Sequence, residues 1–204
     1  MSIPAHRRPP LLPEGYGLGA RDSLPQAVGF MLLSAASFAV MGAFVKAAGD
    51  VPVTEKVFFR NLVTLVVTVG MAIHRRENPF GPTDHLPLLV TRSLSGLVGV
   101  VLYFYALGHL NLADAALLNR VSPFVVTILA ALWLGERITG RITAGLVLAF
   151  LGAALVLQPT FRMDPIAALA GLGSAFGAGF AYAIVRRLKG WERPFRIVFY
   201  FSLI

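Results

Sequence analysis

The sequence contains no cysteine and few charged residues. Only 14% of its 204 residues are charged, whereas soluble chains carry about 25%. The absence of cysteine excludes disulfide bonds, thiol chemistry and thiolate metal ligands. The hydrophobic fraction is 56%, above the roughly 45–50% of soluble proteins. This composition disfavours a water-soluble globular domain and intrinsic disorder, and it predicts a membrane protein.

Acidic residues and histidines are absent from the interior of the long apolar runs. Nine of the ten acidic residues and all four histidines lie outside the runs, and the tenth, Asp114, stands at the start of the fourth run. An intramembrane aspartyl protease needs paired carboxylates, a metal site needs clustered ligands, and a serine nucleophile needs a base. We therefore expect no enzyme, no metal and no cofactor.

The apolar runs themselves predict membrane-spanning helices. A span needs about 20 largely apolar residues, and six runs approach that length: residues 27–48, 57–73, 86–107, 113–134, 142–157 and 167–185. Thr139 and Gly140 can extend the fifth run. A seventh run begins at Phe195 and holds ten residues, which as a helix rise about 15 Å, half of a bilayer core. We expect an all-α polytopic helical bundle, and either a truncated chain or an interfacial C-terminus.

The distribution of positive charge predicts the orientation. Residues 1–26 are polar and proline-rich, so we expect a disordered tail without a signal peptide. If this tail lies inside, the inner segments hold 11 lysines and arginines and the outer loops hold 3. The positive-inside rule then makes the tail cytoplasmic. Membrane orientation thus explains the net charge of +8, and we expect no nucleic-acid partner.

The first and sixth runs indicate an internal repeat. A shift of 140 residues pairs them with eight identities over 40 positions. Both runs carry a small residue at every fourth position, namely Ala35, Ala39, Ala43 and Ala47 in the first, and Ala167, Gly171, Ala175, Gly179 and Ala183 in the sixth. Such stripes allow close helix packing in lipid, although small residues occur in most packed membrane helices. A five-span repeat would invert its second copy, as in many secondary transporters, and would predict about 306 residues in ten spans.

Three arginines lie inside the spans: Arg60, Arg92 and Arg120. A central arginine costs about 2.5–3.5 kcal/mol on insertion scales, so it usually faces a cavity or a partner. Arg60 is three residues inside the expected outer end of its span, and it can instead reach the interface by snorkelling. Arg92 and Arg120 are each about 10 Å deep, which favours a cavity-facing or paired role. Asp114 is a distant candidate partner for Arg120.

Polar residues accompany these arginines. Pro123 has no N–H and frees the carbonyl of Asn119 beside Arg120, which predicts either a polar substrate surface or an ordinary proline kink. Ser95 and Tyr103 share one face of the third span, where Tyr103 either lines the pathway or anchors the helix at the interface. The predicted substrate-binding residues are therefore Arg60, Arg92, Ser95, Tyr103, Asn119 and Arg120, with Pro123 as a helix kink.

Several short motifs occur in a fixed order. They are Phe58-Phe59-Arg60-Asn61, Ala106-Leu107, Ala113-Asp114-Ala115, Ser122-Pro123 and Leu134-Gly135-Glu136. In this order and spacing the chain resembles the drug/metabolite transporter superfamily, specifically its EamA-type domain. The resemblance implies two inverted five-helix repeats, with residues 27–158 as the first and residues 165–204 as the start of the second. It also implies small-molecule transport across the bacterial inner membrane by alternating access, without a bound cofactor.

The resemblance also bears on the site. The family's central cavity draws on the spans that here carry Arg92, Tyr103, Asn119 and Arg120. Arg120 replaces the neutral residue expected before Ser-Pro, and a cation there favours an anionic or zwitterionic substrate. Glu136 is expected either to cap or to pair at the cytoplasmic end with Arg137 or Arg141.

Three functions compete. A solute carrier is favoured by the intramembrane arginines. A non-transporting membrane scaffold or assembly subunit would use the small-residue stripes as its main surface. A lipid-modifying membrane enzyme is disfavoured by the missing intramembrane acids and histidines. A homodimer is also possible, because a second copy could supply further helices.

Overall fold

The computed structural model describes residues 24–76, 78–80, 85–158, 160, 163–188 and 191–204. Within these ranges every regular element is an α-helix and no strand occurs. This confirms the predicted all-α polytopic bundle. Most of the predicted tail, residues 1–26, lies outside the described residues.

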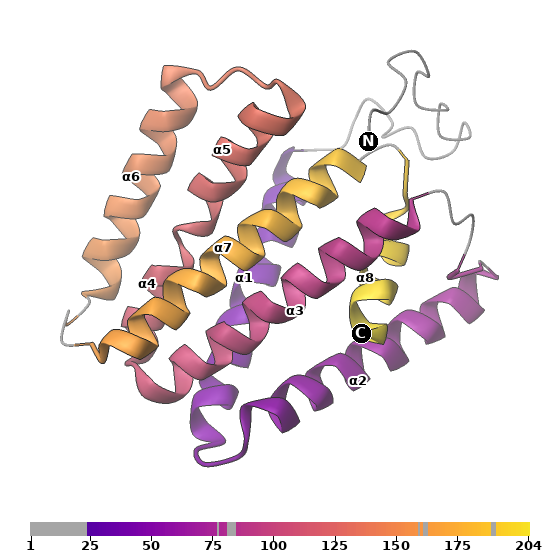
Figure 1. Cartoon of the computed structure of the whole chain (residues 1–204), viewed down its shortest axis with the longest axis horizontal. Helices are drawn as coiled ribbons and strands as arrows, with labels where there is room; N and C mark the ends of the chain where they lie inside the picture. The colour runs from indigo at the N-terminus through magenta and orange to yellow at the C-terminus, as the bar shows by residue number, and fades with distance from the viewer. Residues whose placement is uncertain (1–23, 77, 81–84, 159, 161–162, 189–190) are drawn as a thin grey trace.

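Among the described residues, six segments are long and apolar enough to cross a membrane, as the sequence predicts. Five are single helices: α1 (Leu24–Ala47), α2 (Val53–Arg75), α3 (Leu86–His109), α6 (Gly140–Leu157) and α7 (Pro165–Leu188). The fourth span is divided into α4 (Leu112–Asn119) and α5 (Ser122–Leu134), and the seventh run forms α8 (Pro194–Leu203). Consecutive spans alternate in direction, so the connections gather at two opposite ends of the bundle (Figure 1).

Local sequence signals explain several helix ends. Gly135 adopts φ 68° after α5 and its N–H bonds to the carbonyl of Ala130, a left-handed cap for which glycine has no steric cost. Prolines occupy the first turns of α3, α5 and α8, where a missing N–H leaves no bond unmade. The interruption between α4 and α5 consists of Arg120 and Val121 and ends two residues before Pro123.

The packing of α3 against α7 forms the centre of the bundle (Figure 1). Glycines allow this approach, because a Cβ on Gly177 would lie 2.9 Å from the Cα of Gly99. On other faces of α7, Gly171 meets Leu118 of α4 and Gly179 meets Val125 of α5. The predicted small-residue stripe of α7 is buried, whereas the corresponding stripe of α1 is exposed.

An ion pair and a hydrogen bond connect segments that are distant in sequence. Glu136 pairs with Arg186 at 2.6 Å, so the expected pairing with Arg137 or Arg141 is wrong. The reason is that α7 ends beside the α5–α6 connection, which brings a residue 50 positions away closer than its neighbours in sequence. Tyr200 of α8 donates a hydrogen bond to the carbonyl of Phe80 at 3.3 Å.

Candidate functional site

Two arginines from different helices share one aromatic ring. The guanidinium carbon of Arg92 on α3 lies 4.5 Å from the ring centroid of Phe201 on α8. The guanidinium carbon of Arg60 on α2 lies 5.0 Å from the same centroid. Both are cation–π distances. The structure thus brings together two arginines that the sequence places 32 residues apart.

The bundle provides these arginines with few polar partners. Arg60 donates a hydrogen bond to the side-chain oxygen of its neighbour Asn61 at 2.9 Å. The buried Nε and Nη1 atoms of Arg92 have no hydrogen-bond partner. No carboxylate in the described ranges forms an ion pair with either arginine.

The depth of Arg60 differs from the expectation based on a span that begins at residue 57. α2 begins at Val53, so Arg60 is seven residues into the helix, about 10 Å from its start. The side chain is partly buried between α2 and α8 instead of extending along the outside of the bundle. Its contact with Phe201 supports a role inside the bundle over snorkelling.

Arg120 lies apart from this pair. It is the exposed residue that caps α4, and its N–H bonds to the carbonyls of Ala116 and Leu117. It lies within electrostatic range of the hydroxyl of Tyr103, which is partly buried on α3. Arg120 and Tyr103 therefore form a second polar region at the break in the fourth span.

Asp114 is bound elsewhere, so the suggested pairing with Arg120 is wrong. The buried carboxylate of Asp114 accepts hydrogen bonds from the N–H of Thr160 at 2.9 Å and from its hydroxyl at 2.8 Å. Thr160 precedes α7, so the carboxylate ties α4 to the α6–α7 connection. This interaction is structural and leaves the Arg120 charge unpaired by Asp114.

Asn119 forms a hydrogen bond between helices. Its side-chain amide donates to the hydroxyl of Ser174 on α7 at 3.1 Å, and Ser174 donates in turn to the carbonyl of Gly171 at 2.6 Å. The last residue of α4 is thereby attached to the centre of α7. The bond fixes the position of the helix break relative to the core of the bundle.

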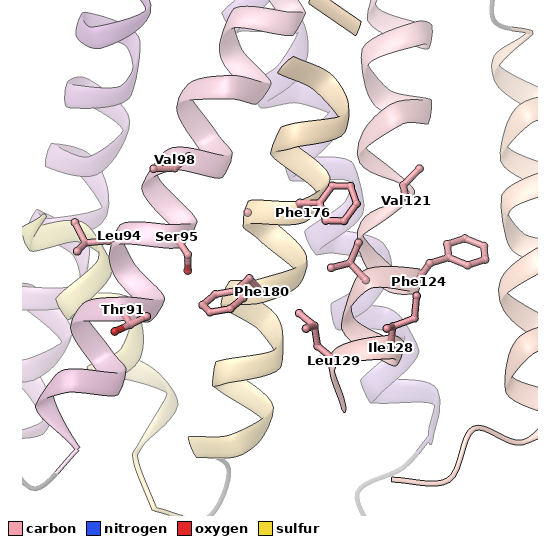
Figure 2. A pocket seen from close by; sticks show the side chains of 12 residues that line it. Thr91, Leu94, Ser95, Val98, Val121, Phe124, Ile128, Leu129, Phe176 and Phe180 are labelled. Carbon is pink, nitrogen blue, oxygen red and sulfur yellow. The ribbon is translucent and has the colours of Figure 1, made fainter. Parts of the chain in front are cut away.

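Ser95 lines a groove of about 710 Å³ between α3, α5 and α7. Figure 2 shows α7 between the other two helices, with Phe180 turned toward α3 and Phe176 toward α5. Most of the lining is apolar, and the hydroxyl of Ser95 donates to the carbonyl of Arg92 at 3.0 Å. Thr91 similarly donates to the carbonyl of Pro87 at 2.7 Å. The groove is suited to an apolar group.

The sequence-predicted residues thus fall into three regions connected through α3: the arginine pair, the helix break and the groove. Sequence reasoning missed Phe201 and Ser174, which complete the first two regions. Phe201 lies in the last apolar run, which holds several aromatic residues, and nothing in the sequence distinguishes Phe201 from the others. Ser174 directly precedes Ala175 of the small-residue stripe, and its hydroxyl in an otherwise apolar run is the signal that could have identified it. In the described part of the chain no cluster of residues could hold a metal ion.

The guanidinium groups of Arg60 and Arg92 are chemically suited to bind an anion. A guanidinium group presents several N–H donors in a plane and matches carboxylate and phosphate groups. Two such groups around one ring, with unpaired buried nitrogen atoms, form a site of excess positive charge inside a bundle of membrane helices. An anionic group on a ligand would compensate this charge.

Comparison with known proteins gives consistent results. Residues 26–158 match the EamA-like transporter family. The chain is similar to the pseudopaline exporter CntI of Pseudomonas aeruginosa, with 36% identity over 191 residues that cover 90% of this chain and 64% of that protein. It is also similar to solute carrier family 35 member G1 of Homo sapiens, with 26% identity over 86% of this chain and 52% of that protein. A riboflavin transporter of Brucella anthropi is 25% identical over 85% of this chain and 62% of its own length. The chain thus spans less than two thirds of each of these relatives.

Proposed function

Because the chain belongs to the EamA-like transporter family, and so to the drug/metabolite transporter superfamily, we propose that it carries a small anionic or zwitterionic metabolite across a membrane by alternating access. The observation that carries this proposal is the arginine pair around Phe201. Charged residues inside a membrane usually mark a substrate or ion pathway. Here the two charges have no described carboxylate partner, and a substrate anion would fill that role.

The other predicted residues have places in this proposal. Arg120 and Tyr103 would form a second contact region at the helix break. Broken helices expose backbone groups that commonly line transport sites. The groove beside Ser95 would accept an apolar part of the solute. Movement of α4 and α5 about the break at Arg120 would alter access, with the bond between Asn119 and Ser174 as one contact that resists it.

The orientation follows from charge. We place the protein in the bacterial inner membrane with a cytoplasmic N-terminus, because lysines and arginines gather at the end where α2, α5 and α7 finish. Export is the direction we favour, by analogy with the relative named as a pseudopaline exporter. On this view residues 27–158 form one five-helix repeat and residues 165–204 begin an inverted second one.

A scaffold is the alternative, and one observation favours it. The stripe formed by Ala35, Ala39, Ala43 and Ala47 is exposed on α1, so a helix of a partner or of a second copy could pack there. The matching stripe on α7 is buried within the chain and is not free for such contact. Of the two stripes, the one on α1 is therefore the surface through which we propose that a homodimer would form.

Transport by purified protein in liposomes tests the proposal. The probes are labelled glutamate and citrate as anionic solutes, choline as a cation, glucose as a neutral solute, and the two solutes named by relatives, pseudopaline and riboflavin. We expect at least one anionic or zwitterionic solute to be transported, and choline and glucose to be excluded. Arg92→Gln should lower that flux about tenfold or more, since a hydrogen bond to a charged group contributes about 1.5–3 kcal/mol.

Arg76→Gln is the matched control. Arg76 is an exposed arginine at the end of α2, away from the arginine pair, and its substitution should leave the flux unchanged. Transport of choline or glucose as fast as of the anions would contradict the proposal, as would an Arg92→Gln variant with full activity. Correct insertion without transport of any probe would favour the scaffold.

A further inference from the structure

A second groove, of about 590 Å³, lies between α2 and α8, which pack side by side (Figure 1). Its walls are formed by apolar side chains of both helices, including Val63, Val67 and Val198. All three side chains are exposed, so the groove is open along the outside of the bundle. The function proposed above assigns no part of the solute to this groove.

One end of the groove adjoins the arginine pair. On α2, Arg60 lies one turn before Thr64, which lines the groove, and on α8, Phe201 lies one turn after Val198, which lines the opposite wall. Residues three or four positions apart share one face of a helix. The guanidinium carbon of Arg60 is 5.0 Å from the centroid of the Phe201 ring. This contact therefore stands where the groove ends, and Arg60 is partly exposed there.

The hydroxyl groups along the groove are bonded within their own helix. Thr64 donates to the carbonyl of Arg60 at 2.9 Å, and Thr68 donates to the carbonyl of Thr64 at 2.8 Å. Both threonines line the groove between valines. The body of the groove therefore offers no free donor to a polar solute, and it is suited to a hydrocarbon chain.

The apolar part of the groove has a defined length. Val63 and Met71 are eight residues apart on α2, which corresponds to about 12 Å along the helix. Beyond Met71 the lining includes the charged side chains of Arg75 and Arg193. A hydrocarbon chain that begins at Arg60 therefore meets apolar walls over about 12 Å and charged side chains beyond, which favours a chain of medium length over a long one.

The groove beside Ser95 runs in another direction. It is lined by Thr91, Ser95 and Val98 of α3 together with side chains of α5 and α7, whereas the guanidinium group of Arg92 lies over Phe201 on α8. An apolar group in that groove and a chain between α2 and α8 would therefore extend from the arginine pair in different directions. Of the two grooves, only the one between α2 and α8 continues the helix faces of Arg60 and Phe201.

We propose that the groove between α2 and α8 binds the hydrocarbon chain of an amphiphilic carboxylate whose anionic group lies at Arg60 and Arg92. This inference rests on the function proposed above, because it assigns a solute class to the same anion site: carboxylates with one unbranched apolar chain. The guanidinium groups match the carboxylate in charge and hydrogen-bonding geometry. Burial of the chain adds affinity in proportion to its apolar area, and a short hydrophilic anion lacks that contribution.

A series of unbranched carboxylates tests the chain. Labelled decanoate is bound to the purified protein in detergent and displaced by unlabelled butanoate, hexanoate, octanoate, decanoate or tetradecanoate, with the free concentration of each measured. We expect the Kd to fall by up to about fourfold for each added methylene group from butanoate to decanoate, and to fall no further for tetradecanoate. Decyltrimethylammonium, a cation with the same chain as a decyl group, should not compete. A Kd that is independent of chain length, or equal competition by the cation, would overturn the proposal.

Tryptophan variants locate the chain. Val67→Trp fills the groove from its exposed wall, and Val66→Trp places the same side chain on an exposed neighbour that does not line it. Because both positions are exposed, both variants should fold. We expect only Val67→Trp to weaken decanoate binding, with butanoate binding unchanged. Equal effects of the two variants would overturn the proposal. So would a loss for Ile128→Trp instead of Val67→Trp, since Ile128 lines the groove beside Ser95.

Glutamine variants locate the carboxylate. Arg60→Gln should weaken binding of butanoate and decanoate alike, by about tenfold or more, as loss of a hydrogen bond to a charged group predicts. The dependence on chain length should persist in this variant. The control is Arg76→Gln, at an exposed position that does not line the groove, and it should have no effect. A loss for Arg75→Gln instead of Arg60→Gln would place the carboxylate at the other end of the groove and overturn the proposal.

Transport in liposomes distinguishes failure of this inference from failure of the proposed function. If anions are transported but their Kd does not depend on chain length, only the assignment of the groove is wrong. If the carboxylate series and the variants behave as expected while no solute is transported, the site between α2 and α8 is supported and the transport proposal is wrong.

Discussion

Gly99 and Gly177 bring the backbones of α3 and α7 into direct contact. A Cβ on Gly177 would lie 2.9 Å from the Cα of Gly99 and 3.0 Å from the carbonyl oxygen of Ser95. These neighbours are backbone atoms, which cannot rotate away as a side chain can. The contact sets the distance between the two central helices, and through them the positions of Arg92 and Ser174.

Gly177→Ala should therefore destabilise the protein by about 1–3 kcal/mol, the usual cost of overpacking a close contact. Thermal unfolding of the purified protein in detergent, followed by helical circular dichroism, measures this. The control is Gly152→Ala on α6, where an added Cβ has nothing within 4 Å and alanine should stabilise the helix slightly. Equal melting temperatures for the two variants would show that α3 and α7 are not in this close contact.

The bond between Asn119 and Ser174 gives a second prediction. Ser174→Ala removes the acceptor for the Asn119 amide, and polar bonds between membrane helices contribute about 0.6 kcal/mol on average and up to about 1.7 kcal/mol. Ser202→Ala is the matched control, because Ser202 is also buried but donates only within α8, to the carbonyl of Phe199.

The free energy of unfolding in mixed micelles is measured for Ser174→Ala, for the Ser202→Ala control, for Asn119→Ala and for the variant with both Asn119→Ala and Ser174→Ala. This double-mutant cycle separates the energy of the Asn119–Ser174 bond from the other effects of each substitution. We expect a coupling energy between Asn119 and Ser174 in the range just given. Additive effects of Asn119→Ala and Ser174→Ala would mean that the bond contributes nothing to the attachment of α4.

Two ion pairs should differ in how much each contributes to the stability of the protein. Glu136 and Arg186 have side chains that are 40% and 46% exposed, whereas those of Glu192 and Arg196 are 3% and 12% exposed. Exposed pairs contribute about 0–1 kcal/mol, and loss of one partner from a buried pair costs about 3–5 kcal/mol. Glu192→Gln should therefore lower the melting temperature far more than Glu136→Gln. A larger loss of melting temperature for Glu136→Gln than for Glu192→Gln would show that the exposed pair contributes more to stability.

The spans could be predicted well from the sequence, because the length and hydropathy of an apolar run identify a membrane helix. The fifth run, extended to Gly140, coincides with the helix Gly140–Leu157. Other ends were less predictable. α2 begins at Val53, four residues before the apolar run, because polar residues such as Glu55 and Lys56 are accommodated where the helix leaves the bilayer.

Pairings between helices were beyond the sequence for a physical reason. Glu136 pairs with Arg186 although two other arginines are nearer in sequence, and Asp114 bonds to Thr160 instead of Arg120. Each choice depends on which helix ends meet, and that depends on the packing of α4, α5 and α7. Apolar periodicity identifies the helices but does not show which helices pack against each other. Single residues of the candidate site could therefore be predicted from the sequence, whereas their contacts with one another could not.

Phe201 gives the last prediction, because it is the contact common to both arginines. A cation–π contact contributes about 0.5–2 kcal/mol when partly desolvated, and Phe201→Leu removes two such contacts while it keeps an apolar side chain. Without the ring, the guanidinium groups of Arg60 and Arg92 lose their shared contact. Binding of an anionic solute should weaken, and the KM for its transport should rise about fivefold or more.

Two further variants make the test specific to the ring. Phe201→Tyr keeps the aromatic face and should retain a KM close to that of the wild type. Phe199→Leu alters a buried phenylalanine of the same helix that packs against Phe80 and contacts neither arginine through its ring, so it should change stability without changing the KM. If Phe201→Leu and Phe199→Leu affect transport alike, then Phe201 contributes only packing. A raised KM for Phe201→Leu alone, restored by Phe201→Tyr, would establish that the shared ring holds the two arginines in the geometry that binds the anion.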